Sequence, residues 1–408
     1  MTSAAIDHMI SVTILVAALL VAMVTFNGMF ATAADYDRNR KVANKAVDIM
    51  NTICLSPGNP VDWGETDAPV LGFGLQDPQS GGYTLSPYSM MRLQTRDSSG
   101  GSQLVEYPPD SGEFYNNMSG NFGHGIFTPI GDCLNNSEVA ELLGLNGMYG
   151  FSLDIVPTLD VRIFQIDTKP LKLKVEVYGA GIPLSGATLN CHLFQVVKGD
   201  DLYPAIATYT HVTQTNSSGV VNIIFPEVTN NDPSYTFTVY ANIGGLNGVG
   251  YFTHNTIAEG DPQYIIPLIK DFDSGEVYIA HNWLFDSPEV KYNATFFILT
   301  PDFQLQNVPI EPIEASTGHL NYGGGFPFSE IELPESEIGF LVITYRKSAT
   351  EMGSVILPWG VGTLGISVYF DDGGINSSGY HFVATELRQV TIDNISYQIK
   401  VSTWSLRS

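Results

Sequence analysis

The feature that most constrains this chain is an uncharged apolar run near its start. No Asp, Glu, Lys or Arg occurs from Met9 to Ala34, in MISVTILVAALLVAMVTFNGMFATAA. The run exceeds the roughly 20 residues that an α-helix needs to cross a bilayer. A cleaved secretory signal has a basic start and a shorter apolar core, whereas this chain starts MTSAAIDH. The sequence therefore predicts an apolar helix that the fold retains.

The helix is expected to continue beyond the apolar run. The stretch from Asp35 to Cys54 contains no Gly or Pro and breaks only at Ser56-Pro57-Gly58. Apolar residues recur there at helical spacing, at Val42, Ala46, Ile49, Met50 and Ile53. One helix within 1–54, regular from about Ile6 to Cys54, would be on the order of 70 Å long. Its first half would be apolar all round and its second half amphipathic.

This helix and the segment behind it resemble known surface proteins. A helix with an apolar first half and an amphipathic second half resembles that of type IV pilins. The following segment is similar to archaeal type IV pilin-like surface proteins in Pro57-Gly58-Asn59-Pro60-Val61-Asp62-Trp63-Gly64, Gly74-Leu75, Leu85-Ser86 with Met91 and Leu93, and Leu142-Leu143-Gly144-Leu145 with Tyr149 and Phe151. Trp63 is interpreted as a core residue under a Pro-rich turn rather than as a ligand-stacking platform.

The resemblance implies a role for particular helix residues. In pilin filaments the apolar halves bundle into a core, where Ala17, Ala18, Ala22 and Gly28 would permit close helix approach. Asp7 would lie in that core and pair with the terminal amine of a neighbouring subunit, since an unpaired charge there is costly. The alternative is that Asp7 is an ordinary interfacial residue at the end of a membrane anchor.

The distribution of cations bears on orientation. Arg38, Arg40, Lys41 and Lys45 follow the apolar run and no Lys or Arg precedes it. By the positive-inside rule this bias would retain the C-terminal bulk in the cytoplasm. Pilin precursors overcome it with a basic leader that a dedicated peptidase removes. Either such a leader precedes the start of this sequence, or the chain is an uncleaved relative.

The rest of the chain is expected to be β-rich. Charged residues make up 15% of a chain with 40 Gly, 20 Tyr and 22 Phe, which is typical of strands and turns rather than of solvated helices. The predicted fold class is mainly β with one long N-terminal helix. A small α+β domain at 55–159 precedes an Ig-like β-sandwich at 160–256 and a C-terminal β-sandwich at 257–408. The alternation of Leu171, Leu173, Val175 and Val177 with charged residues marks a strand with one buried and one wet face.

Composition and motifs exclude several functions. The net charge of -24 disfavours binding to nucleic acid. No GxSxG, P-loop or HExxH motif occurs, and the eight histidines have no ligand spacing. We therefore predict no catalytic residues, no cofactor and no metal site. Asp200-Asp201 and Asp371-Asp372 could hold Ca²⁺, but solvated turns are the favoured interpretation.

Two further sets of residues bear on an extracellular location. Cys54 and Cys133 could form one disulfide that ties the helix end to the first globular domain, with Cys191 left as a buried thiol. Sequons for N-glycosylation occur at Asn117, Asn135, Asn216, Asn293, Asn376 and Asn394.

The expected function is structural. The chain would be a subunit of an extracellular filament that assembles with copies of itself through the helix, after a stage of membrane insertion. Its β-domains would face outward for adhesion or lateral contact with other surface proteins or glycans. A second hypothesis is a membrane-anchored surface protein that never polymerises. A third, an exported carbohydrate-directed hydrolase, lacks any acid/base pair in a recognisable setting.

Overall fold

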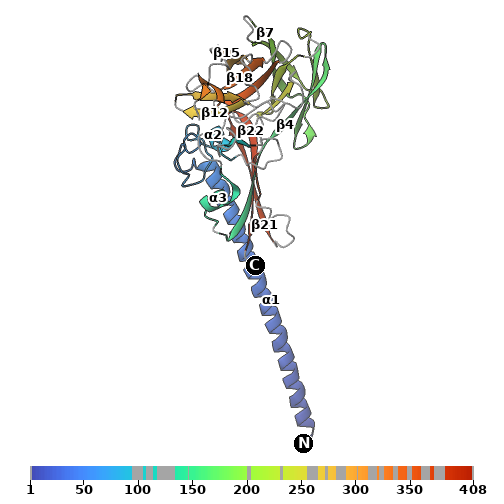
Figure 1. Cartoon of the computed structure of the whole chain (residues 1–408). Coiled ribbons are helices and arrows are strands. Elements are labelled where there is room, and N and C mark those ends of the chain that lie inside the picture. Colours follow the sequence, from blue (N-terminus) through green and yellow to red (C-terminus); the bar gives the residue numbers. More distant parts are fainter. Residues whose placement is uncertain are drawn as a thin grey trace.

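A long rod-like helix carries a head made mostly of β-strands (Figure 1). The computed structural model describes residues 2–93, 104–106, 114–116, 134–145, 147–199, 204–229, 233–254, 265–271, 274–281, 291–300, 302–310, 319–320, 326–333, 339–346, 352–359, 368–371 and 382–406. In these residues the chain is mainly β with a single long N-terminal helix, so the predicted fold class is confirmed.

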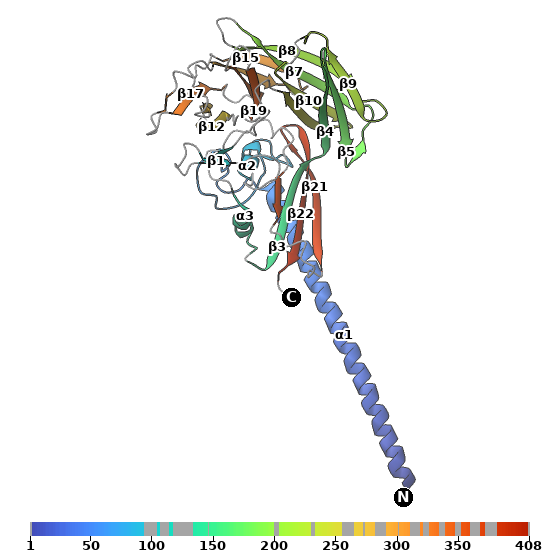
Figure 2. The ribbon, with the colours of Figure 1, turned by 45° about the vertical axis from the view of Figure 1, so that its right-hand side comes forward.

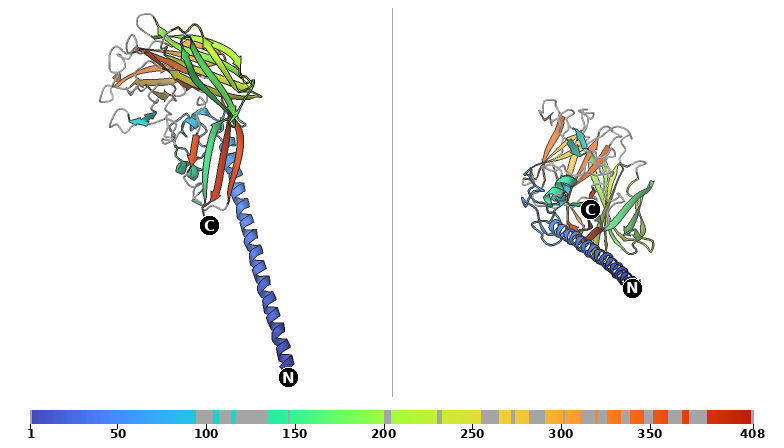
Figure 3. Two further views of the ribbon diagram at one scale, coloured as in Figure 1. Left: turned by 90° about the vertical axis from the view of Figure 1, so that its right-hand side faces the viewer. Right: turned by 90° about the horizontal axis from the view of Figure 1, so that it is seen from below.

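The long helix α1 runs without interruption from Thr2 to Leu55. The predicted continuous helix is therefore confirmed, and Gly28 does not break it. The helix ends where predicted, because Pro57 disfavours helical geometry at Ser56 and Gly58 adopts a positive φ of 93°. Figure 3 shows the first half of α1 extending away from the head while the second half lies against it.

The second half of α1 packs on a four-stranded antiparallel sheet of order β20-β3-β22-β21. These strands are β3 (Tyr149–Pro157), β20 (Val368–Asp371), β21 (Val383–Ile392) and β22 (Ile395–Ser405). The helix face that meets β21 and β22 carries Val42, Ala46, Ile49, Met50 and Ile53, all at most 2% exposed. These are the residues whose helical spacing the sequence displays. Figure 2 shows the strands beside the helix at the base of the head.

Short helices and loops in the segments 56–93 and 134–145 cover the end of α1. They include α2 (Pro87–Met91), capped by Ser86, and α3 (Asn136–Leu142). The N-cap of α3 is Asn135, and it forms a capping box with Glu138. Gly144 follows the end of α3 with a φ of 66°.

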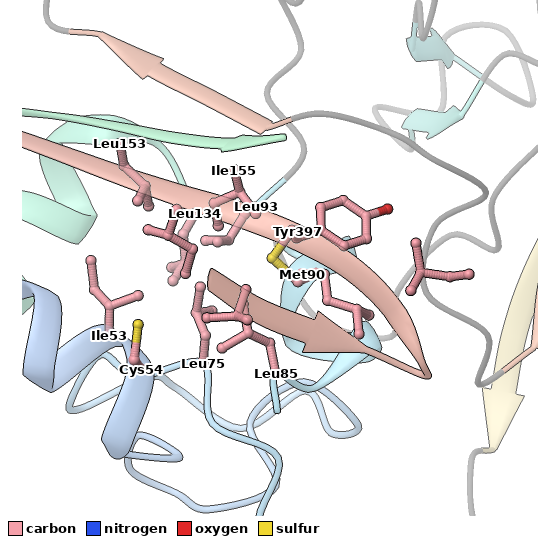
Figure 4. Close-up of a cluster of buried hydrophobic side chains, with 14 of the residues drawn as sticks. Ile53, Cys54, Leu75, Leu85, Met90, Leu93, Leu134, Leu153, Ile155 and Tyr397 are labelled. Carbon is pink, nitrogen blue, oxygen red and sulfur yellow. The ribbon is translucent and has the colours of Figure 1, made fainter. Parts of the chain in front are cut away.

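The core under these helices contains residues far apart in the sequence. Figure 4 shows Ile53 and Cys54 of α1 beside Leu75, Leu85 and Leu134, with Leu153, Ile155 and Tyr397 of the sheet across from them. Trp63 is fully buried, and its indole Nε1 donates to the carbonyls of Pro57 and Gly74. It is a core residue, as predicted.

A β-sandwich follows. One sheet contains β4 (Leu159–Thr168), β5 (Leu171–Gly179), β6 (Ile182–Pro183) and β9 (Val220–Phe225). The other has the order β11-β10-β7-β8, from β7 (Thr188–Lys198), β8 (Pro204–Gln214), β10 (Tyr235–Ile243) and β11 (Leu246–His254). Leu171, Leu173, Val175 and Val177 of β5 face Leu189, Leu193, Phe237 and Val239 in one shared core.

A third layer covers the other face of the β11-β10-β7-β8 sheet. It is the sheet β15-β14-β18-β19, made of β14 (Lys291–Leu299), β15 (Leu305–Pro309), β18 (Gly339–Arg346) and β19 (Met352–Trp359). The remaining strands are β1 (Leu104–Glu106), β2 (Phe114–Asn116), β12 (Ile265–Asp271), β13 (Glu276–His281), β16 (His319–Leu320) and β17 (Phe326–Glu332). The central strands of the middle sheet, β7 and β10, are thus largely buried on both faces.

The sheets divide the chain differently from the predicted domains. The prediction placed 368–405 in a C-terminal sandwich at 257–408, but β20, β21 and β22 belong to the sheet built on β3. β22 pairs with β3 along its length, from Tyr397 opposite Pro157 to Ser405 opposite Tyr149. The chain therefore returns to the base of the head at its C-terminal end.

Candidate assembly surface on the N-terminal helix

The first half of α1 exposes apolar side chains on all sides. Fifteen large apolar residues are 46–72% exposed: Ile6, Met9, Ile10, Val12, Ile14, Leu15, Val16, Leu19, Leu20, Val21, Met23, Val24, Phe26, Met29 and Phe30. Fully burying one such side chain stabilises by about 1.5–3 kcal/mol, so covering all of them is worth on the order of tens of kcal/mol. Among the described helices, α1 alone is long and apolar enough to cross a membrane.

The hydroxyl groups of this half are satisfied within the helix. Ser11, Thr13, Thr25 and Thr32 each donate to the carbonyl four residues earlier, at 2.8–2.9 Å. Between Ile6 and Ala34 no other Ser or Thr occurs. A helix in an apolar surrounding needs such internal bonds, because an unbonded hydroxyl there is costly. These internal bonds were not predicted, although the positions of the four residues in the sequence could have indicated them.

The predicted small residues lie on two faces rather than on one. At about 100° per residue, Ala18 and Ala22 share one face of an ideal helix, whereas Ala17 and Gly28 lie roughly 100° away. All four are exposed. A Cβ added to Gly28 would meet no atom within 4 Å, so none of the described residues requires a glycine there. The two faces could each admit a neighbouring helix at close range.

Asp7 lies at the exposed apolar end of α1. Its backbone carbonyl accepts the Ser11 hydroxyl at 2.8 Å, and its carboxylate forms no ion pair with another described residue. The predicted pairing of Asp7 with another chain stays a prediction.

A charged collar, residues 35–41, separates the two halves of α1. Arg38 lies 3.8 Å from Asp35, and Lys41 lies 2.7 Å from Asp37. The hydrogen bond with the Asp37 carboxylate, together with its charge, raises the pKa of Lys41. One turn further on, Lys45 Nζ donates to the Leu143 carbonyl at the C-terminal end of α3. The collar therefore lies between the apolar half of α1 and the half that packs on the head.

The predicted disulfide involves one described cysteine. Cys54 is a buried free thiol whose Sγ contacts Met50 Sδ at 3.5 Å, and burial raises its pKa to about 12. Cys133 lies outside the described residues and no disulfide is seen at Cys54, so the predicted bridge is not supported. Cys191 is a buried thiol in the sandwich core, as predicted, and its pKa is also raised by burial to about 12.

The sequons differ in their surroundings. Asn117 and Asn376 lie outside the described residues, whereas Asn135, Asn216 and Asn394 are exposed in a helix cap, a loop and a hairpin turn. Asn293 lies within β14, where its Nδ2 donates to the Pro204 carbonyl at 3.1 Å. Because a glycan would be joined through that nitrogen, the three exposed sites fit the predicted modification and Asn293 does not.

The described residues contain no group of three or more His, Cys, Asp or Glu that could hold a metal ion. Asp200, Asp201 and Asp372 lie outside them. Asp371 is the last residue of β20.

Comparisons with known proteins do not identify a family. No family model matches the chain, and no curated protein matches it. Among solved structures it is similar to the crystal structure of red sea bream transglutaminase, at 10% identity over 54% of this chain and 33% of that one, with a TM-score of 0.18. It is also similar to the D0-D1 domain of intimin, at 13% identity over 53% of this chain and 99% of that one, with a TM-score of 0.19. The chain thus spans about a third of the transglutaminase, and at these TM-scores neither likeness assigns a function.

Proposed function

We propose that this chain is a non-enzymatic structural subunit of an extracellular filament of the archaeal type IV pilus-like kind. Copies assemble through the first half of α1, which the membrane holds before assembly. The β head faces outward for adhesion or lateral contacts with other surface proteins or glycans. The supporting observation is that one unbroken helix has an apolar half exposed on all sides and a second half packed on the head.

The continuity of α1 supports assembly. Because its second half is packed on β21 and β22, the projecting half cannot swivel freely relative to the head. Repeated packing of helices would therefore also set the spacing of the heads. The two faces marked by Ala18 and Ala22, and by Ala17 and Gly28, favour contact with more than one neighbouring helix. The hydroxyls of this half are bonded within the helix, so they add no unsatisfied donor to a helix contact.

A second candidate is a membrane-anchored surface protein that does not polymerise. The length of the apolar half and the collar directly after it favour this function, because a single anchor needs no more than a span and a polar boundary. Asp7 would then lie at the membrane surface. The two candidates differ in whether copies of α1 contact one another.

The test is a substitution in the apolar half. We expect Ala22→Lys to abolish filaments in electron micrographs, because a charge in a dry helix bundle costs at least ~2.5 kcal/mol. The head should stay folded by circular dichroism, since Ala22 contacts none of its core residues. Ala22→Ser is the matched control and should retain filaments, because its hydroxyl can bond within the helix. Asp7→Ala should be milder than Ala22→Lys.

Two results would decide against the filament. The first is native material that is only monomeric and membrane-bound. The second is an Ala22→Lys variant that still forms filaments.

A further inference from the structure

β8 is a long edge strand, and most of its length has neither charged residues nor proline, which usually keep an edge strand from pairing with another chain. β8 has eleven residues, Pro204–Gln214, about 37 Å at the rise of an antiparallel strand. Its sequence PAIATYTHVTQ has no Asp, Glu, Lys or Arg and is rich in β-branched residues. All eleven residues are in register with β7, without a bulge.

The backbone of β8 is paired on one side only. Apart from Pro204, whose carbonyl accepts from Asn293 Nδ2, its backbone pairing within the described chain runs to β7. In an antiparallel pair, every second residue directs its N–H and C=O away from the partner strand. Among the residues that the structure describes, the outer edge of β8 therefore presents a row of donors and acceptors without a strand partner. Val212, which is 58% exposed, adds apolar surface beside this row.

The other described edge strands are short, interrupted or covered. Charged side chains occur in β4, β12, β20 and β21, and proline occurs in β12, β15 and β19. β9 is uncharged but has six residues, while β6 and β16 have two each. β11 is covered by β4, since a Cβ on Gly248 would lie 2.6 Å from Leu159. Charge, proline and short length are the devices that keep sheet edges from pairing, and β8 lacks all three along most of its length.

We propose that this edge pairs with β8 of a second copy of the chain, antiparallel and about a two-fold axis. Two copies that each carry a net charge of -24 repel, so they can approach closely only through uncharged surface, which β8 provides. With Tyr209 on the axis, Thr208 lies opposite Thr210 of the second copy, and Ile206 lies opposite its Val212. Thr–Thr and aliphatic pairs of this kind stabilise antiparallel sheets.

The location of β8 in the head determines which copies of the chain this contact can join. β8 lies along the end of the head farthest from the start of α1 (Figure 2). The contact therefore joins heads that face each other, from two filaments or two membranes, rather than neighbours along one helix bundle. One pair of strands buries little surface and binds weakly by itself. Many heads that pair at the same time would hold two filaments or two membranes together. The inference rests on the proposed function for the outward orientation of the head, whereas the pairing does not require the helix to assemble.

The test uses the full chain inserted in phosphatidylcholine vesicles, with clustering followed by light scattering. Wild-type vesicles are expected to cluster. The Thr208→Lys/Thr210→Lys variant should cluster more slowly by on the order of tenfold, because each lysine faces another across the axis. Mixing these vesicles with vesicles carrying Thr208→Glu/Thr210→Glu should restore clustering. Ile182→Lys, at an exposed position of β6, is the matched control and should behave as wild type.

A second measurement tests the register. When Thr208→Cys and Thr210→Cys chains are mixed and oxidised, disulfides between the two variants should exceed those within either one. The idea fails if wild-type vesicles do not cluster, if the lysine pair clusters at the wild-type rate, or if the lysine and glutamate variants do not complement each other. Filament formation is scored separately by electron microscopy. Vesicle clustering without filaments would leave the strand pairing intact and remove only the filament.

Discussion

At the scale of single residues, polar groups in the core have specific partners. Trp63 holds together the turn after α1, because its indole donates to Pro57 at 2.9 Å and to Gly74 at 3.0 Å. The Arg92 guanidinium lies over the ring at 5.3 Å and donates to the Trp63 carbonyl. This group of contacts anchors the first globular segment to the end of the helix.

We expect Trp63→Phe to lower the free energy of unfolding by about 2 kcal/mol, because two buried carbonyls lose their donor while most of the ring volume remains. Denaturant unfolding would measure the change. Tyr36→Phe, at an exposed position of α1, should have no comparable effect. An unchanged midpoint in Trp63→Phe would mean that water replaces the indole at no cost.

His192 of β7 lies against the segment that joins β14 and β15. Its Nε2 donates to the Phe303 carbonyl at 2.8 Å, its Nδ1 faces the Thr210 hydroxyl at 3.4 Å, and its ring contacts Tyr240. Burial lowers the pKa of His192, and the hydrogen bond to Phe303 opposes this shift only in part. The folded state therefore prefers the neutral ring.

The unfolded chain takes up a proton at His192 at a higher pH than the folded chain does. The free energy of unfolding is therefore highest above the ordinary histidine pKa of about 6.5 and decreases as the pH falls below it. We expect His192→Gln, which keeps a donor for Phe303, to reduce the fall in melting temperature between neutral and mildly acidic pH. Calorimetry at several pH values would measure it. An identical pH dependence in both proteins would exclude His192 as the source.

At the level of secondary structure, the two halves of the single helix α1 differ in how their side chains are buried. The second half has a single buried face and the first half has none. In the proposed filament, copies of this half would cover one another, and the sites of closest approach should be its small residues.

We expect Gly28→Leu to impair filament assembly and Gly28→Ala to be tolerated, since alanine still permits close approach and stabilises a helix by about 1 kcal/mol over glycine. Neither change should destabilise the head, because no atom lies near the added Cβ. Electron microscopy and thermal unfolding of both variants would check this. Normal filaments from Gly28→Leu would place the helix contact on another face.

At the scale of the whole molecule, two separate cores contain the two described thiols. Cys54 lies in the core shared by α1, the first globular segment and β22, whereas Cys191 lies inside the sandwich. Both thiols have a pKa raised by burial to about 12, so neither should react at neutral pH in the folded protein.

We expect Ile399→Ala, in the centre of β22, to cost about 2–5 kcal/mol and to make Cys54 react faster with a thiol reagent. Cys191 should stay protected, because its core is separate. Mass spectrometry of labelled peptides would distinguish the two sites. Equal exposure of both thiols would show that the head unfolds as one unit.

The helices and their ends could be predicted from local patterns in the sequence. The length of α1, the buried face of its second half, the cap at Ser86 and the stop at Gly144 follow from helical spacing and from the conformational limits of proline and glycine, which act over a few residues. The apolar half and its small residues were predictable for the same reason.

Only the tertiary structure decided which strands meet. β3 pairs with β22, far along the chain, and no local pattern encodes a contact between segments so distant in sequence. In β10 the alternation of Thr236 with Phe237 and Val239 indicates one wet face, yet Thr236 is buried and bonded to Ser354 at 2.9 Å. A polar side chain next to water and one next to a polar partner give the same sequence pattern, because both satisfy the same hydrogen bonds.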